Sequence, residues 1–148
     1  MNAESPVKIV RRFAEALDHE DYALARELLA EECVYRIRGE EHAGPEAIIS
    51  SYQGNGDEAA RSFDSIAYRS AVRPEGAGSA TIEFVDEIQH RGLSLTHRCE
   101  QRVAINDVGK IVRIDHADLP GERSRLESFR KSCGPGGGPP AGPGSLPE

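Results

Sequence analysis

Three side chains in the second half of the sequence, Asp86, His97 and Asp118, are of the types that acid–base chemistry needs. A carboxylate beside a histidine fixes the tautomer of the imidazole and raises its pKa, which leaves the other ring nitrogen to move a proton. A second carboxyl in an apolar pocket can stay protonated and donate a hydrogen bond to a developing oxyanion. Together these groups suit the enolisation or aldol cyclisation of a carbonyl compound.

The spacing of two turns predicts that these three residues lie in one row across a sheet. A two-residue hairpin at Arg91-Gly92 places Asp86 opposite His97. A four-residue connection over residues 106–109 then places His97 opposite Asp118. Both registers pair apolar residues with each other, which supports them independently.

Other interpretations of this row stay open. The second register also places His116 opposite Cys99, diagonally next to the row. A buried Asp–His pair often only satisfies its own hydrogen bonds, and one β-bulge would dissolve the row. His97, His116 and one of the two aspartates also resemble a set of two histidines and a carboxylate that binds a metal. Because side chains from neighbouring strands rarely converge on one ion, we expect no metal.

The elements that position these residues follow an order typical of an α+β fold. Apolar residues at helical spacing predict helices at 6–17, 22–29 and 45–53, with Gly54-Asn55-Gly56 ending or loosening the third. Alternating apolar and polar residues predict strands at 33–38, 66–73, 80–89, 93–105 and 110–118. A short, highly charged helix or extension is expected at 122–131.

Composition limits the partners and the compartment. The chain of 148 residues carries 18 Lys and Arg against 25 Asp and Glu, and this net charge of −7 disfavours nucleic acid as a partner. No apolar run is long enough to span a membrane, and the first residues do not resemble a signal peptide. The three cysteines, Cys33, Cys99 and Cys133, form no CxxC pair. We therefore expect a cytoplasmic protein with no membrane or nucleic-acid partner.

The chain is expected to form one folded domain over residues 1–131 and a disordered tail over residues 132–148. The last 15 residues contain six glycines and five prolines. Such a segment has too few apolar side chains to offset the entropy lost on ordering.

The order of elements resembles the nuclear transport factor 2-like superfamily, and within it the SnoaL-like polyketide cyclases and ketosteroid isomerases. The stretches that carry this resemblance are 29–35, the helix start at 44–48, and 108–111. The resemblance implies a cone-shaped, curved, mostly antiparallel sheet wrapped around N-terminal helices, with an internal pocket. It also implies a homodimer formed through the outer face of the sheet. Because the superfamily holds enzymes, binders and association domains, the fold does not decide the function.

The residues of ketosteroid isomerase are not retained. That enzyme uses a carboxylate base, with a tyrosine and a protonated aspartate as oxyanion donors. The aligned base position is Ile37, the aligned tyrosine position is Phe13, and the donor aspartate falls at Arg98 or His97. We therefore do not expect ketosteroid isomerisation by that mechanism.

The sequence favours a protein that binds a small molecule and needs no cofactor. If it is an enzyme, it is an isomerase, cyclase or dehydratase acting on a carbonyl-bearing apolar compound. We expect a catalytic group of His97, Asp118, Asp86 and His116, and a ligand-binding wall of Tyr35, Ile37, Phe13, Phe84, Gln101 and Ile114. The alternatives are a non-catalytic binding or dimerisation module, and a regulatory protein that uses its Gly/Pro-rich tail.

Overall fold

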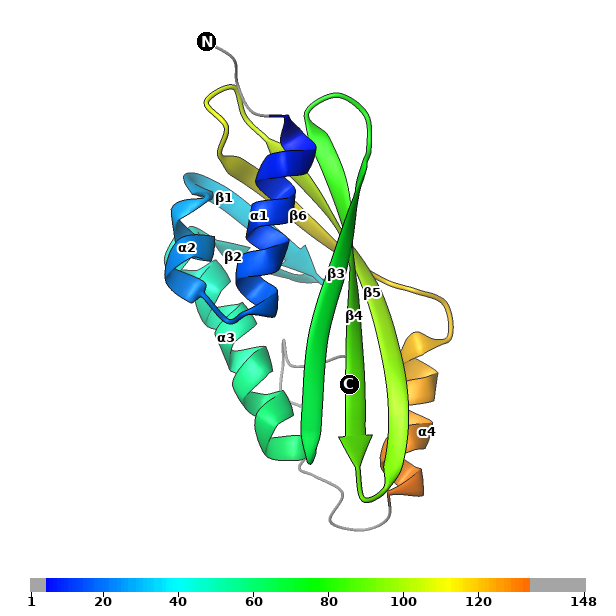
Figure 1. Ribbon diagram of the computed structural model, residues 1–148. Helices are drawn as coiled ribbons and strands as arrows, with labels where there is room; N and C mark the ends of the chain where they lie inside the picture. The colour runs from blue at the N-terminus through cyan, green and yellow to red at the C-terminus, as the bar shows by residue number, and fades with distance from the viewer. Residues whose placement is uncertain (1–4, 134–148) are drawn as a thin grey trace.

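The computed structural model describes residues 5–133, which form four helices packed on one six-stranded sheet (Figure 1). The helices are α1 (Pro6–Asp18), α2 (Tyr22–Glu27), α3 (Pro45–Ser62) and α4 (Glu122–Ser132). The strands are β1 (Leu29–Ile37), β2 (Glu40–Ala43), β3 (Ser65–Pro74), β4 (Ser79–His90), β5 (Leu93–Ile105) and β6 (Ile111–Asp118). This curved, open sheet with helices packed on it confirms the expected α+β class.

The first two helices begin where their capping residues predict. The Ser5 hydroxyl accepts a hydrogen bond from the backbone nitrogen of Lys8, with Pro6 in the first turn. The Asp21 carboxylate likewise accepts from the backbone nitrogen of Leu24. One face of α1 is buried against the sheet because its apolar residues recur at helical spacing.

The third helix is longer than the sequence predicts. Gly54 and Gly56 do not end it, and α3 continues to Ser62. A Cβ atom at position 56 would lie 3.0 Å from the Tyr22 hydroxyl, so the glycine allows α2 and α3 to approach closely. Tertiary packing therefore outweighs the low helix propensity of the glycines.

The sheet is mixed, with the strand order β2-β1-β6-β5-β4-β3. The pairing of β1 with β6 is parallel and the other pairings are antiparallel. Strand β2 was not predicted, because three of its four residues are polar and it is mostly exposed. It joins β1 through a tight turn at Arg38-Gly39, where both residues have a positive φ.

The register between β4 and β5 is as predicted. The hairpin turn is Arg91-Gly92, with φ of 51° and 79°, and Asp86 lies opposite His97. The alternation of β4 holds in part: Ala80, Ile82 and Ile88 are buried as predicted, but Thr81 and Val85 of the other face are buried too. Local turn chemistry therefore set the register of this pair of strands correctly.

The predicted register between β5 and β6 is wrong by two residues. Asp118 lies opposite Cys99, not opposite His97, and His116 lies opposite Gln101. The connection occupies residues 106–110, one residue more than predicted, and the register shifts again next to Ala104. Because of this irregularity, Asp86, His97 and Asp118 do not lie in the predicted row.

The apolar interior has two parts. The larger lies between α1, α3 and the sheet, and includes Phe13, Ile48 and Ile114. The smaller lies at the end of the β4–β5 hairpin, where Leu126 and Phe129 of α4 pack with apolar residues of α3, β4 and β5. The charged segment expected near residue 122 is therefore a helix with one buried apolar stripe.

Three further findings concern the sequence-based expectations. No helix within residues 5–133 is long and apolar enough to cross a membrane. Cys33, Cys99 and Cys133 are buried, free thiols. Ser132 is the last residue of α4, and the rest of the predicted tail lies outside the described residues apart from Cys133.

Candidate functional site

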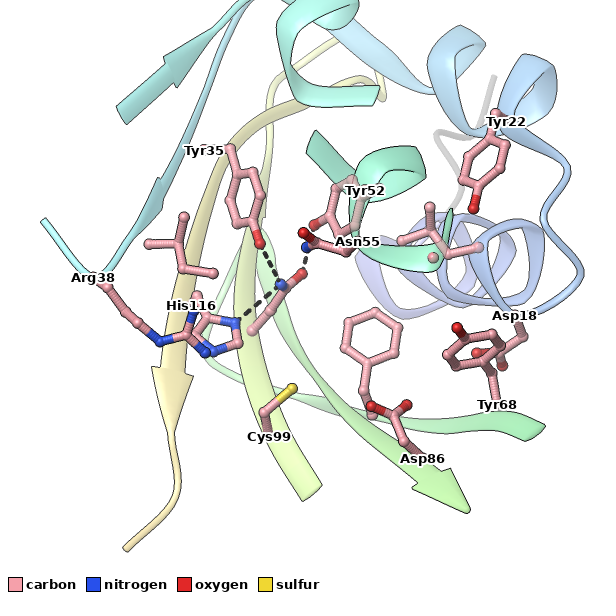
Figure 2. A pocket seen from close by; sticks show the side chains of 15 residues that line it. Asp18, Tyr22, Tyr35, Arg38, Tyr52, Asn55, Tyr68, Asp86, Cys99 and His116 are labelled. Atoms are coloured by element: carbon pink, nitrogen blue, oxygen red, sulfur yellow. Dashed lines mark hydrogen bonds between the residues drawn. The ribbon is translucent and has the colours of Figure 1, made fainter. Parts of the chain in front are cut away.

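A pocket lies between the concave face of the sheet and the first three helices (Figure 2). Its volume is about 110 Å³, and the pocket is open to solvent on one side. Sites for drug-sized molecules are typically about 300–1,000 Å³, so the enclosed part of this pocket suits a small ligand or one portion of a larger one. Its walls consist of Leu17, Asp18, Tyr22, Tyr35, Ile37, Arg38, Tyr52, Asn55, Gly56, Tyr68, Phe84, Asp86, Cys99, Gln101 and His116.

One side of the pocket holds a chain of hydrogen bonds centred on Gln101. The Tyr52 hydroxyl donates to Oε1 of Gln101 at 2.6 Å. The Gln101 amide nitrogen lies 3.0 Å from the Tyr35 hydroxyl and 3.2 Å from Nδ1 of His116. Because an amide nitrogen only donates, Nδ1 of His116 is the acceptor and the ring carries its proton on Nε2.

The His116 proton points to Asp118, which also binds Arg38. Nε2 of His116 lies 2.9 Å from Oδ1 of Asp118, and Arg38 donates to both oxygens of that carboxylate at 2.8 Å. Arg38 reaches Asp118 from the tight turn after β1, where its φ is 46°. We call Arg38, Asp118, His116 and Gln101 the paired end of the pocket, because each side chain has a partner.

The contacts at the paired end shift the pKa values of Asp118 and His116. Burial alone would raise the pKa of Asp118, but the hydrogen bonds from Arg38 and His116 outweigh it and hold the pKa below its ordinary value. Burial lowers the pKa of His116, against the opposing pull of Asp118. Near neutral pH the histidine is therefore neutral and the carboxylate is charged.

The other side of the pocket holds two carboxyl groups, Asp18 and Asp86, which we call the acidic end. Asp86 is 7% exposed, and no side chain within residues 5–133 hydrogen-bonds to its carboxyl. Burial and the nearby charge of Asp18 raise the pKa of Asp86 to about 7. Asp18 accepts a hydrogen bond from Ser70 at 2.6 Å, and burial raises its pKa despite that bond.

His97 lies beside Asp86 but does not line the pocket. It is 1% exposed, and its Nδ1 is 3.9 Å from Oδ2 of Asp86, beyond hydrogen-bond distance. Neither ring nitrogen has a hydrogen-bond partner among the described residues. Burial lowers the pKa of His97 to about 4, so this ring is neutral near neutral pH.

The structure brings together six of the ten residues selected from the sequence. Those that line the pocket are Asp86, His116, Tyr35, Ile37, Phe84 and Gln101. Asp118 lies behind His116 and binds it. Phe13 and Ile114 are fully buried, and Phe13 packs against the ring of Tyr52.

Six polar residues of the pocket were not selected: Arg38, Tyr52, Asp18, Tyr68, Tyr22 and Asn55. Tyr52 shares the buried face of the predicted third helix with Ile48 and Ile49, which was a usable signal. Tyr68 has the inward parity of its strand, which was a second signal. The contact of Arg38 with Asp118 spans 80 positions and has no signature in one sequence.

The pocket was also tested as a metal site. No group of three or more His, Cys, Asp or Glu side chains in the described part of the chain is arranged to hold an ion. His97 and His116 do not come together, because their positions on β5 and β6 follow the corrected register.

Solved structures with the same arrangement of helices and strands come from several bacteria. A proposed polyketide cyclase from Pseudomonas putida is 16% identical, with a TM-score of 0.64 over 81% of this chain and 96% of that chain. An NTF2-like protein of unknown function from Exiguobacterium is 15% identical, with a TM-score of 0.60 over 76% of this chain and 98% of that chain.

A third structure contains a ligand. RV0760c from Mycobacterium tuberculosis, in complex with estradiol-17β-hemisuccinate, is 14% identical, with a TM-score of 0.58 over 80% of this chain and 98% of that chain. No family model matches the sequence, and no curated protein matches it. At these identities the similarity concerns the fold alone, and it confirms the expected cone of sheet and helices.

Proposed function

Starting from the NTF2-like, SnoaL-like fold of this chain, we propose that the protein binds a small, moderately apolar carbonyl compound and catalyses proton transfer next to the carbonyl without a cofactor. The observation that carries this proposal is the buried Asp86 carboxyl, which faces an apolar pocket and has a pKa of about 7. A base with a pKa near the working pH is the most effective in proton transfer.

Asp86 is proposed as the base in place of His97, the base expected from the sequence. Asp86 lines the pocket, whereas His97 is buried behind it, and its pKa of about 4 makes its neutral ring a weak base. The apolar neighbours of Asp86 in the wall, Phe84 and Cys99, would exclude water from the reacting carbon.

Tyr35 is the group proposed to polarise the carbonyl oxygen. Its hydroxyl accepts from Gln101, so its own proton is available to a ligand, whereas the Tyr52 hydroxyl already donates to Gln101. Burial raises the pKa of Tyr35, so the phenol stays protonated. Figure 2 shows Tyr35 and Asp86 on different sides of the same pocket.

The proposed step is common to several reactions. Asp86 takes the proton from the carbon next to the carbonyl, and the oxygen of the resulting enolate accepts a hydrogen bond from Tyr35. Return of the proton to another carbon is an isomerisation, attack on a second carbonyl is a cyclisation, and loss of a β-hydroxyl group is a dehydration. The estradiol ester in the mycobacterial structure makes rigid, apolar ring systems the first ligand class to test.

Exchange of the α-protons of ketones in deuterium oxide tests this step, whichever reaction follows it. We expect the wild type to accelerate exchange in a steroid ketone or an alkyl phenyl ketone, followed by proton NMR. Asp86→Asn should lower the exchange rate by about 100-fold or more, because it removes the base. Asp107→Asn, in an exposed turn, is the control with the same change in charge and should match the wild type. Ketones that bind without exchange would contradict the proposal.

The second candidate is a non-catalytic ligand-binding module. It is favoured by the paired end, where both nitrogens of His116 and both oxygens of Asp118 already have partners. A satisfied cluster of this kind stabilises a pocket without moving protons. In that case ligands bind and Asp86→Asn changes affinity only.

A homodimer through the outer face of the sheet is also proposed. That face carries ion pairs between strands, such as Arg69 of β3 with Glu87 of the neighbouring β4 at 2.9 Å, and Arg73 of β3 with Glu100 of β5 at 3.1 Å. Two copies related by a two-fold axis could exchange these partners across the interface. Light scattering should give twice the chain mass at micromolar concentration, and a monomer would contradict the proposal.

A further inference from the structure

The acidic end of the pocket has carboxylate oxygens without partners. Oδ2 of Asp18 accepts from Ser70, but Oδ1 of Asp18 is buried and has no hydrogen-bond partner within residues 5–133. Asp86 is 7% exposed, faces the same space and makes no hydrogen bond to a described side chain. A buried acceptor that is left unpaired costs free energy, so both groups can gain from a donor in the ligand.

The surroundings of these carboxyls are negative. Asp18 is the last residue of α1, where the helix dipole already disfavours an anion. Each carboxyl also lies near other acids: Asp18 and Glu87 act on Asp86, and Glu15 acts on Asp18, which has His19 as its basic neighbour. A ligand with a positive charge would relieve this repulsion.

The one arginine in the pocket wall does not offset the negative charge of the acidic end. Arg38 donates to both oxygens of Asp118 at the paired end. The acidic end is lined instead by the rings of Tyr22 and Tyr68, and Figure 2 shows Tyr68 beside Asp18. Aromatic faces next to carboxylates attract organic cations.

We propose that the ligand carries a protonated amine, which pairs with the carboxylate of Asp18 among the rings of Tyr22 and Tyr68. The substrate class is then an apolar amino ketone, with its amine at the acidic end and its carbonyl near Tyr35. This proposal rests on the proposed function for the position of the carbonyl and for the role of Asp86. An organic ammonium fits better than a metal ion, because the described residues bring no third ligand to this pair.

A matched pair of ligands tests the amine directly. The first is a phenyl ketone with a dimethylamino group at the end of a propyl chain, and the second has an isopropyl group in place of the dimethylamino group. Calorimetry at low salt should show that the wild type binds the amine about tenfold more tightly than the neutral ketone. Added salt should reduce this preference, because ions screen a partly exposed charge pair.

Two variants distinguish an effect of the acidic end on ligand preference from an effect of the net charge of the protein. Asp18→Asn keeps an oxygen that can accept from Ser70 and should abolish the preference for the amine. Asp107→Asn makes the same change of charge in an exposed turn and should keep it. Equal affinities of the wild type for the two ligands, or binding of neither, would overturn the inference even if Asp18→Asn fails to fold. So would a preference that survives in Asp18→Asn.

The outcomes also distinguish this inference from the proposed function. If the neutral ketone exchanges its α-protons but the amine has no advantage, the proposed function stands and the inference fails. If the amine is preferred through Asp18 but neither ketone exchanges, the inference stands and the catalytic proposal fails.

Discussion

The charged side chains have partners at one end of the pocket and lack them at the other. At the paired end the partly buried Arg38 and Asp118 neutralise each other, and the neutral His116 binds the same carboxylate, through hydrogen bonds of 2.8–2.9 Å. At the acidic end two carboxyls share one apolar space, and their pKa values are raised. The paired end therefore gains little from a ligand and holds the shape of the wall. The acidic end is unsatisfied, which is the property expected of a group that binds or reacts.

The acidic end should make the protein less stable as the pH rises. The pKa of Asp86 is raised from 3.8 to about 7 on folding, so its contribution to stability is complete below about pH 4 and is lost as the pH rises through 7. The difference corresponds to about 4 kcal/mol. Urea unfolding of Asp86→Asn and wild type should therefore show that the advantage of the variant grows by up to this amount between pH 4 and pH 8. A constant difference would mean that Asp86 is not buried as described.

His97 should have the opposite effect on how stability depends on pH. Its pKa is lowered from 6.5 to about 4, so its contribution to stability is present above pH 6.5 and is lost as the pH falls to about 4. In the same unfolding experiment, His97→Leu should gain about 3 kcal/mol relative to the wild type between pH 7 and pH 4. Only this change with pH is diagnostic, because any packing cost of the leucine is the same at each pH. A gain in the opposite direction would show that a protonated His97 is stabilised.

The two stacked tyrosines allow a test of which hydroxyl meets the ligand. Tyr35 and Tyr52 have ring centroids 5.0 Å apart and both bind Gln101, but only the Tyr35 proton is not committed to Gln101. Tyr35→Phe should lower the rate of α-proton exchange by about 100-fold, the effect typical of losing an oxyanion donor. Tyr52→Phe is the matched control and should lower it by less than about tenfold. Equal losses in both variants would indicate a structural role for the pair.

The smallest effect is expected from breaking the paired end. Asp118→Ala leaves Arg38 and His116 without their partner and should cost about 2 kcal/mol of unfolding free energy. Asp115→Ala is the matched control, because Asp115 binds Arg113 at 2.7 Å on the exposed side of the same strand. It should cost about 0.5 kcal/mol or less. Equal costs would mean that the paired end is no more desolvated than the surface.

The sequence predicted the fold and one of the two registers that position the site. Arg91-Gly92 adopts the tight turn its residues favour, so Asp86 and His97 were placed opposite each other correctly. The second register failed because a shift of two residues keeps every side chain on its original face. Pairing apolar residues with apolar ones cannot detect such a shift, so the position of Asp118 was not determined.

Long-range packing explains the remaining errors. Gly54 and Gly56 were expected to end or loosen the third helix, but α3 continues through them. The close approach of Gly56 to Tyr22 brings together two helices that are distant in the sequence, so one sequence does not show it. His97 was correctly assigned to the inner face of β5. Its separation from the pocket was not predicted, because residues 122–131 were expected only as a charged helix or extension, with no apolar stripe, although α4 buries Leu126 and Phe129.

The strand order has a consequence for biosynthesis. The β1–β2 hairpin is connected to the rest of the sheet through β6, the last strand to be made. A ribosome that has added Ile105 has synthesised every strand but β6, yet the two halves of the sheet cannot join. Until β6 emerges, one edge of β1 and one edge of β5 remain open to other chains. Nascent chains stalled in the connection over residues 106–110 should therefore be the most aggregation-prone and the most dependent on chaperones.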